Sequence, residues 1–270
     1  MKEKQYHIAV IGGGASGLLA AIAAKIEGGS RCRVVILERN ERVGRKILST
    51  GNGRCNLGNT VIQKEKYGGS MVEKAFSILE QAPKAEVYFR QMGLICRKEE
   101  HRLYPYSNHA NAVLDVLRLQ LEALQIDVIC NCKIVAITPI KNMFRLKSNV
   151  DSYLAEKVVF SCGGYAAPAL GTDGSAFSML KTLHIQCNAC TPALCFLKTN
   201  PEWVRALKGI RLLSQVTLYR NGKRLKTERG EVQFTEQALS GICIFNLSAD
   251  YKPEEKHVVY EVVLDLLPDW

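Results

Sequence analysis

Three glycines and one carboxylate near the start of the chain have the spacing of a dinucleotide-binding site. Gly12, Gly14 and Gly17 form a Gly-x-Gly-x-x-Gly pattern, and Glu38 follows Gly17 by 21 residues. In such sites the first glycine permits a tight turn, the second lets the backbone approach a pyrophosphate, and the third lets helix and strand pack closely. A carboxylate at the position of Glu38 can accept hydrogen bonds from a ribose diol. These four residues therefore predict that an adenine dinucleotide binds here.

The segments around these glycines have the patterns of the elements that must position them. Residues 6–11 (YHIAVI) and 33–38 (RVVILE) are short apolar runs typical of buried parallel strands. Between them, residues 18–27 (LLAAIAAKIE) are strong helix formers, which Gly28 and Gly29 terminate. The start of this helix would offer free N–H groups and a partial positive charge to phosphates. The order of these segments predicts a Rossmann-type α/β fold.

A cationic, glycine-rich loop, residues 44–56 (GRKILSTGNGRCN), follows the second predicted strand. It has too little apolar periodicity for a helix and too many glycines and asparagines for a long strand. Its backbone N–H groups can wrap a bound cofactor, and its Arg and Lys side chains can neutralise a diphosphate. A simple NAD dehydrogenase usually continues into another crossover helix at this point. We therefore expect FAD, with an NAD(P)-dependent dehydrogenase as the alternative.

Three longer stretches, residues 7–24, 35–56 and 158–177 (VVFSCGGYAAPALGTDGSAF), resemble the BaiN/RdsA-type flavoproteins, also described as aminoacetone-oxidase-like FAD-binding enzymes. The blocks RLYPYSNHA, PALCFL and GEVQFTEQALSG resemble further blocks of that family, so the resemblance covers nearly the whole chain. The sequence departs from the family pattern at a few positions in expected turns. These positions are Leu183, Glu236, Gln237, Ala238 and Ile242.

The resemblance implies a two-dinucleotide-binding, Rossmann-like FAD domain with a β-rich second domain inserted into it. It also implies a set of cofactor-binding residues with four roles. Some line the diphosphate, some hold the adenosine ribose and some run beside the isoalloxazine, while Ile134 reads the adenine through its main chain. At the end of the predicted strand before residues 163–164, a side chain would clash with the cofactor, which explains paired glycines there. The implied residues are Gly12, Gly14, Ala15, Ser16, Gly17, Glu38, Arg39, Arg45, Lys46, Gly51, Asn52, Gly53, Arg54, Cys55, Asn56, Ile134, Gly163 and Gly164.

The sequence changes near residue 191 from alternating helix and strand patterns to mainly strand patterns. Residues 1–190 read as the Rossmann-like FAD domain, with its final segment absent, and residues 191–270 as the start of the inserted β-rich substrate domain, with a hairpin turn at Asn221-Gly222. Residues 109–124 have the apolar spacing of an amphipathic helix, with Val113, Val116, Leu117, Leu121 and Leu124 near one face. Residues 70–92 have helix-like patterning on either side of Pro83, with possible core positions at Ala75, Phe76, Leu79, Val87, Phe89 and Met92. Because nothing after the β-rich part returns to the first domain, we expect a C-terminally truncated chain, whose activity is in doubt.

Several residues invite a chemical role without a clear pattern to support it. His184, Cys187, Cys190 and Cys195 have spacing that zinc could use, but a second Cys-x-x-Cys pair is missing, so we expect no metal. The Cys55 thiol stands beside a cation that could lower its pKa, yet no second cysteine lies in its loop for redox exchange.

Catalytic residues stay unassigned at this point. Asp173 can cap a helix, although a catalytic role is open. Arg54 and Asn56 are candidates for tuning the flavin or holding an anionic substrate. Because a flavin carries the hydride and electron transfer itself, the missing acid–base pair does not exclude an enzyme.

Composition limits the remaining possibilities. The net charge is +10, but no nucleic-acid-binding motif is visible, and no apolar run is long enough to span a membrane. We expect a cytoplasmic FAD-dependent oxidoreductase that acts on a small organic or steroid-like substrate by hydride transfer through the flavin, with NAD(P)H as a possible electron donor. A flavin-binding or nucleic-acid-binding module without turnover is the other alternative. The substrate and the oligomeric state are not encoded in any pattern we find.

Overall fold

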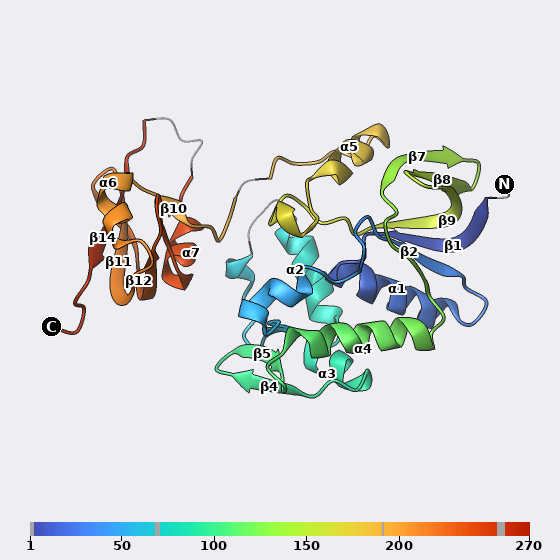
Figure 1. The fold of residues 1–270 in the computed structure, drawn as a ribbon, viewed down its shortest axis with the longest axis horizontal. Helices are drawn as coiled ribbons and strands as arrows, with labels where there is room; N and C mark the ends of the chain where they lie inside the picture. Colours follow the sequence, from blue (N-terminus) through green and yellow to red (C-terminus); the bar gives the residue numbers. More distant parts are fainter. Residues whose placement is uncertain (1–2, 68–70, 191, 253–256) are drawn as a thin grey trace. The chain divides into compact units, whose positions relative to one another are not determined.

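The computed structural model describes residues 3–67, 71–190, 192–252 and 257–270. The chain divides into two compact units, Met1–Asn188 and Ala189–Trp270 (Figure 1). None of the described helices is long and apolar enough to cross a membrane.

The first unit alternates strands and helices. Its strands are β1 (Lys4–Ile11), β2 (Val34–Leu37), β3 (Gly58–Asn59), β4 (Cys96–Glu99), β5 (Arg102–Pro105), β6 (Asp127–Ile129), β7 (Ile134–Ile140), β8 (Met143–Ser148) and β9 (Ser152–Phe160). Its α-helices are α1 (Ala15–Gly28), α2 (Val72–Gln81), α3 (Ala85–Gln91), α4 (Ala110–Ala123) and α5 (Ser175–Thr182). Its 3-10 helices are η1 (Ile47–Gly53), η2 (Lys64–Lys66) and η3 (Pro168–Leu170).

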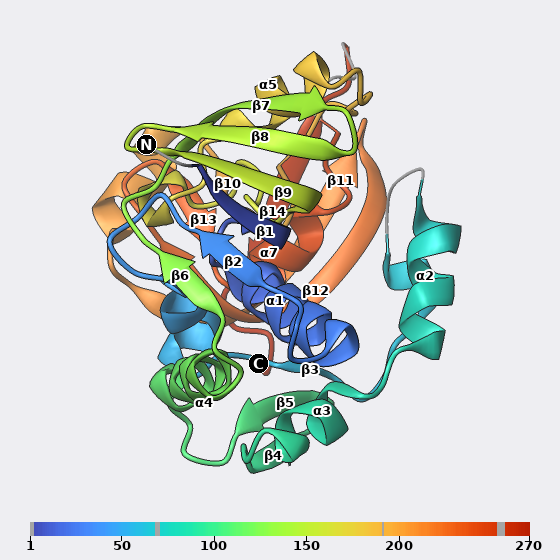
Figure 2. The same ribbon diagram turned by 90° about the vertical axis from the view of Figure 1, so that its right-hand side faces the viewer.

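A six-stranded sheet in the order β6-β2-β1-β9-β8-β7 organises this unit (Figure 2). The pairs β6–β2, β2–β1 and β1–β9 are parallel, whereas β9–β8 and β8–β7 are antiparallel. Val10 in β1 lies opposite Ile36 in β2 and Val159 in β9, so the strand before the glycine turn is central and hydrogen-bonded on both sides. This arrangement confirms the expected Rossmann-type fold. A separate three-stranded sheet has the order β3-β5-β4.

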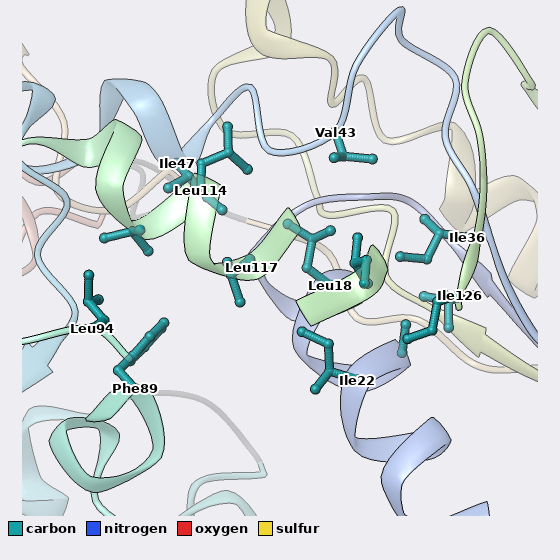
Figure 3. Close-up of a cluster of buried hydrophobic side chains, with 14 of the residues drawn as sticks. Leu18, Ile22, Ile36, Val43, Ile47, Phe89, Leu94, Leu114, Leu117 and Ile126 are labelled. Atoms are coloured by element: carbon teal, nitrogen blue, oxygen red, sulfur yellow. The ribbon is translucent and has the colours of Figure 1, made fainter. Parts of the chain in front are cut away.

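The central strands are apolar on both faces because each face covers a separate core. Side chains alternate between the faces of a strand, so Val10 and Ile36 point toward α1 and α4 while Ala9 and Leu37 belong to the core on the other side. Figure 3 shows the first core, where side chains from α1, α3, α4 and the loop after β2 meet. The labelled members are Leu18, Ile22, Ile36, Val43, Ile47, Phe89, Leu94, Leu114, Leu117 and Ile126.

Helix α4 packs against the glycine-rich loop of residues 44–56. The expected amphipathic helix is present, with Val113, Leu117 and Leu121 buried as predicted from their spacing. Its Leu114 lies so close to Gly44 that a side chain there would meet the Leu114 Cδ1 atom at 2.2 Å. Helix α4 also packs against η1, which is part of the same loop.

The pair of helices expected on either side of Pro83 is also present, but the burial expected for the first one is wrong. Ala75 and Leu79 were expected in the core, yet α2 contains no buried residue, and Ile78 is 63% exposed. In α3, Phe89 is buried as expected, whereas Val87, also expected in the core, is exposed. An amphipathic pattern therefore identified helix α2 correctly without specifying what covers its apolar face.

The second unit is built on a five-stranded antiparallel sheet in the order β10-β13-β12-β11-β14. Its elements are β10 (Leu197–Lys198), α6 (Pro201–Val204), η4 (Arg205–Leu207), β11 (Arg211–Arg220), β12 (Lys223–Phe234), β13 (Ala238–Ser240), α7 (Ile242–Ser248) and β14 (Tyr260–Asp265). Asn221 and Gly222 connect β11 to β12 with φ angles of 49° and 73°, as expected for a type I′ hairpin turn. Helix α7 covers one face with Ile244 and Leu247 fully buried.

Candidate cofactor-binding site

A cavity of about 500 Å³ opens at the carboxyl end of β1, where several segments of the first unit meet. These are the glycine turn and the start of α1, the loop from Glu38 to Leu57, the start of β7, and the segment from Ser161 to Ala176. Ligands of open α/β sheets bind at this edge, outside the carboxyl ends of the strands. Its volume is in the range of small-molecule and cofactor sites.

The three fingerprint glycines have different physical roles in the turn. Gly12 has a φ of 101°, and a Cβ there would lie 2.5 Å from the Ser161 carbonyl oxygen. A Cβ on Gly17 would lie 1.9 Å from the Gly12 carbonyl oxygen, so α1 packs directly on the turn. A Cβ on Gly14 would meet no heavy atom within 4 Å, although Gly14 lines the cavity. The first and third glycines thus fit the protein together, and the second leaves space for a ligand.

The N-terminus of α1 faces this space. Gly14 is the N-cap residue and has no side chain with which to cap the helix, and the first intrahelical bond runs from Leu18 N to Gly14 O. The amides of residues 14–17 precede the helical bonding pattern. Amides in this position, together with the helix dipole, favour an anionic ligand such as a phosphate.

Glu38 is buried at the end of β2, with only 6% of its surface exposed. Its Oε2 accepts a hydrogen bond from Gly13 N at 2.6 Å, and its Oε1 accepts from Asn40 N at 2.8 Å and Asn40 Nδ2 at 2.6 Å. An ionised carboxylate has about four acceptor positions. These three bonds fix the carboxylate against the glycine turn and leave acceptor capacity on the cavity side, where Glu38 is a lining residue.

The cationic side chains of the loop reach across to the segment from Gly163 to Asp173. Lys46 Nζ donates to Ala166 O at 2.6 Å and to Thr172 Oγ1 at 2.8 Å. Arg45 donates to Asn40 Oδ1 at 3.2 Å and to Ala169 O at 3.5 Å. The two segments are therefore tied together beside the cavity.

Asp173 and Arg39 form a further bridge between these segments. Asp173 Oδ1 accepts a hydrogen bond from Ser175 N at 3.0 Å at the start of α5, and Arg39 Nη1 lies 2.8 Å from the same oxygen. The hydrogen bonds from Ser175, and then the Arg39 guanidinium, hold the pKa of Asp173 well below its usual range. The N-cap residue of α5 is Gly174, so Asp173 lies one residue before the cap and bonds the first residue of the helix from there.

Comparison with known families places this site in context. The family described as "HI0933-like protein Rossmann domain" matches residues 6–240. The chain belongs to this family. The match includes both the glycine turn and most of the second unit, and the resemblance stated from the sequence is confirmed.

Two curated relatives extend the comparison. The chain is 33% identical over 243 residues to the 3-dehydro-bile acid delta(4,6)-reductase of Clostridium scindens, covering 89% of this chain and 59% of that protein. It is 24% identical over 278 residues to the ribosomal RNA dihydrouridine synthase of Escherichia coli, covering 98% of this chain and 65% of that protein. This member of the HI0933-like family thus spans about three-fifths of the length of the curated relatives it matches.

A solved structure shows the same fold at low sequence identity. The 3-ketosteroid-Δ4-(5α)-dehydrogenase of Rhodococcus jostii RHA1, in complex with 4-androstene-3,17-dione, superposes with a TM-score of 0.50. It is 13% identical, and the match covers 81% of this chain and 57% of that one.

The HI0933-like chain brings most of the residues expected from the sequence to one cavity. Those that line it are Gly12, Gly14, Ala15, Ser16, Glu38, Arg39, Arg45, Lys46, Cys55, Asn56, Ile134 and Gly163. Other expected residues lie beside lining residues in the chain, or between Thr50 and Cys55, without lining the cavity themselves. They are Gly17, Gly51, Asn52, Gly53, Arg54 and Gly164.

Sequence reasoning missed several lining residues. Asn40 orients Glu38, and its position two residues after the acid was the available signal. Ser161 and Cys162 directly precede the predicted Gly163-Gly164 pair and line the same wall. Others come from elements whose approach to the cavity no local pattern indicates, and they include Leu57, Phe89, Val113, Leu117 and Met179.

Two of the thiols that line the cavity, Cys55 and Cys162, are buried in a way that disfavours the thiolate. Burial raises the pKa of the Cys55 thiol, so the lowering expected from its cationic neighbour is wrong. Burial, followed by the Glu38 carboxylate, raises the pKa of Cys162 to about 11. Among the described residues, no three His, Cys, Asp or Glu side chains gather in a way that could hold a metal ion.

Proposed function

We propose that this chain binds FAD, with the diphosphate at the N-terminus of α1 and the adenosine ribose at Glu38. One observation carries this proposal. The open space at Gly14, the uncapped amides of α1 and the buried Glu38 carboxylate all face the same cavity of about 500 Å³. Anion-binding amides and a ribose-accepting acid are the two parts that an adenine dinucleotide requires.

The rest of the cavity fits the flavin half of such a cofactor. Leu57, Phe89, Val113 and Leu117 provide apolar lining, and the loop that ends at Asn56 provides backbone and amide groups. Apolar walls with a few polar groups are typical of cofactor sites. The cations proposed to lie nearest the phosphates and ribose of the bound FAD are Arg39, Arg45 and Lys46.

FAD, when bound, would supply two-electron hydride chemistry. The residues of the chain would bind and orient it and exclude water from its apolar end. Two of the thiols that line the cavity, Cys55 and Cys162, have pKa values that burial raises, so they would stay protonated at neutral pH and would not act as nucleophiles.

We further propose an FAD-dependent oxidoreductase that acts on a small organic or steroid-like molecule, with NAD(P)H as a possible electron donor. The names of both curated relatives describe the saturation of carbon–carbon double bonds, one in a 3-dehydro-bile acid and one in uridine. In each case the double bond is conjugated to a carbonyl group, which makes its far carbon accept hydride. A carbon–carbon double bond conjugated to a carbonyl is therefore the proposed substrate class. A cytoplasmic location is part of the same proposal.

An RNA base is a second candidate substrate. The Escherichia coli relative acts on ribosomal RNA by its name, and the net charge of this chain is +10. RNA binding through cations falls steeply with salt concentration. Retention of RNA at low salt but not at high salt would favour this candidate over a steroid-like molecule.

The deciding experiment is to purify the protein, denature it and identify the released cofactor by its absorbance and mass. Release of FAD supports the proposal, whereas release of NAD(P) alone would support the dehydrogenase alternative. A colourless protein that also fails to bind added FAD at micromolar concentration would refute both flavin proposals. Anaerobic reduction of the bound flavin by NADH or NADPH then tests the electron donor.

A further inference from the structure

The wall of the cavity between Thr50 and Leu57 has a backbone conformation that side chains rarely adopt. Gly51, Asn52, Gly53 and Cys55 all have φ between 56° and 81°. Left-handed conformations cost energy for residues with a Cβ and persist only where the surroundings determine them. The two of these residues that have a Cβ, Asn52 and Cys55, therefore need contacts that hold the loop in this conformation.

The loop's own hydrogen bonds are short-range. Arg54 N donates to Gly51 O at 3.2 Å and Cys55 N to Thr50 O at 3.0 Å. At its end, Leu57 N pairs with Leu103 O at 2.8 Å. These bonds close the turn and fix its exit, but they do not tie its centre to the rest of the unit.

The side chain of Arg54 does tie the centre down. Its Nε and Nη2 both donate to Asn108 Oδ1, at 3.1 and 2.9 Å, and its Nη2 also lies 2.5 Å from Glu99 Oε2. Its guanidinium lies over the Tyr104 ring, 4.0 Å from the ring centroid. Tyr104 is buried and also faces Gly51, where a Cβ would meet its Cε1 at 3.4 Å. One side chain thus connects the loop to β4, to β5 and to the turn before α4.

We propose that Arg54 is a positioning residue that holds the wall from Gly51 to Asn56 in its binding-competent conformation. It acts through Asn108, Glu99 and Tyr104 and does not itself contact the cofactor, because it does not line the cavity whereas Cys55 and Asn56 do. This inference rests on the proposed FAD site and assigns the wall to the flavin half. It revises the sequence-based interpretation of Arg54 as a group that tunes the flavin or holds an anionic substrate.

The test compares Arg54→Met with Arg97→Met as a matched control. Arg97 is in β4 and bonds the same Glu99 carboxylate, and among the described residues it forms no hydrogen bond or ion pair with residues 50–57. If Arg54→Met leaves the wall competent in about one-tenth of the molecules, the apparent Kd for FAD rises about tenfold. The Kd for ADP, which lacks the flavin half, changes less than about twofold by the same reasoning. We expect Arg97→Met to leave both constants unchanged.

A lysine at position 54 separates charge from geometry. Lys keeps the positive charge but lacks the planar fork that bonds Asn108 and Glu99 together. We expect Arg54→Lys to restore little of the FAD affinity. Full rescue by Lys would indicate a simple charge effect and overturn the positioning role, as would an equal loss of FAD and ADP affinity or an equal effect of the Arg97 control.

Hydrogen exchange of residues 50–57 gives a readout without any cofactor. We expect faster exchange in Arg54→Met than in Arg97→Met, and equal exchange would overturn the inference. This measurement also separates the two proposals, since a wild-type protein that never binds FAD would refute the proposed function while the exchange result still decides the role of Arg54. Should Arg54→Met fail to fold, Asn108→Gly removes the shared acceptor while tolerating the φ of 56° at that position, and the same exchange comparison applies.

Discussion

The same substitution at two glycines of one turn should have opposite consequences. An alanine at Gly17 would place its Cβ 1.9 Å from the Gly12 carbonyl oxygen, and real Cβ atoms essentially never approach within 3.0 Å. Helix α1 and the turn would have to separate by roughly 1 Å, an overpacking that costs about 3 kcal/mol of unfolding free energy. In a unit of this size, that loss lowers Tm by about 6–12 °C.

An alanine at Gly14 should fold almost normally and lose the cofactor. Its Cβ meets no heavy atom within 4 Å, and the φ of −79° suits any residue. The expected loss of stability is about 0.5–1 kcal/mol, because alanine is a poor N-cap residue. If the Cβ keeps the diphosphate from two amides, about 3 kcal/mol or more of charge-assisted hydrogen bonding is lost. The Kd for FAD should then rise at least about 100-fold.

Differential scanning calorimetry of the ligand-free proteins and titration with FAD measure the two effects separately. Gly58→Ala is a matched control, since its Cβ would make only an ordinary contact with Ala85 at 3.8 Å and Gly58 does not line the cavity. The reasoning is wrong if Gly14→Ala binds FAD within about threefold of the wild type. It is equally wrong if Gly17→Ala keeps the wild-type Tm.

Other features of the site lead to further expectations. Hydrogen bonding to Arg54 lowers the pKa of Glu99, so this carboxylate stays charged below its ordinary pKa, and its ion pair with Arg54 weakens only as pH falls through the lowered value. The ratio of FAD dissociation constants between Arg54→Met and wild type should therefore be constant from about pH 8 to about pH 5. A change in this ratio near pH 6 to 7 would contradict the reasoning. If Lys46 acts through Thr172, the double variant Lys46→Met, Thr172→Val should change the rate of FAD release by less than the sum of the two single effects, measured by stopped-flow fluorescence. Full additivity of the two single effects would show independent roles. With its pKa raised to about 11, Cys162 should be only about 0.1% thiolate at pH 8. Peptide mass spectrometry after brief iodoacetamide treatment should therefore find Cys162 unmodified when exposed thiols have already reacted. Labelling of Cys162 as early as the exposed thiols would refute this.

Local patterns predicted the parts of the site that are close in sequence. The glycine turn and Glu38 could be assigned because turn, helix and strand follow one another directly, and each leaves its own residue signature. Helix α4 was predicted because its apolar spacing matches one helical face. The same reasoning found α2 but misjudged its burial, since a periodic apolar face does not identify its partner.

Partners distant in sequence limited the prediction at Arg54 and Cys55. Glu99 and Asn108, which bond Arg54, are 45 and 54 residues further along the chain, and no local pattern links them to the loop. For Cys55 the neighbouring cation suggested an activated thiol. The left-handed turn instead buries the sulfur while the Arg54 side chain extends to other partners, so desolvation determines the direction of the pKa change.

The contact between Gly12 and Ser161 has a consequence for how the protein is made. Ser161 directly follows strand β9, its N–H donates to Ile11 O at 2.9 Å, and its carbonyl oxygen lies 2.5 Å from where a Cβ of Gly12 would be, so this residue packs directly against the glycine turn. During translation the N-terminal glycines leave the ribosome long before β9 does. At about 5–20 residues per second, this delay amounts to roughly 7–30 s. Throughout that interval the nascent chain carries the glycine turn without Ser161 beside it, so under the proposed function FAD binding has to wait until this residue has been synthesised.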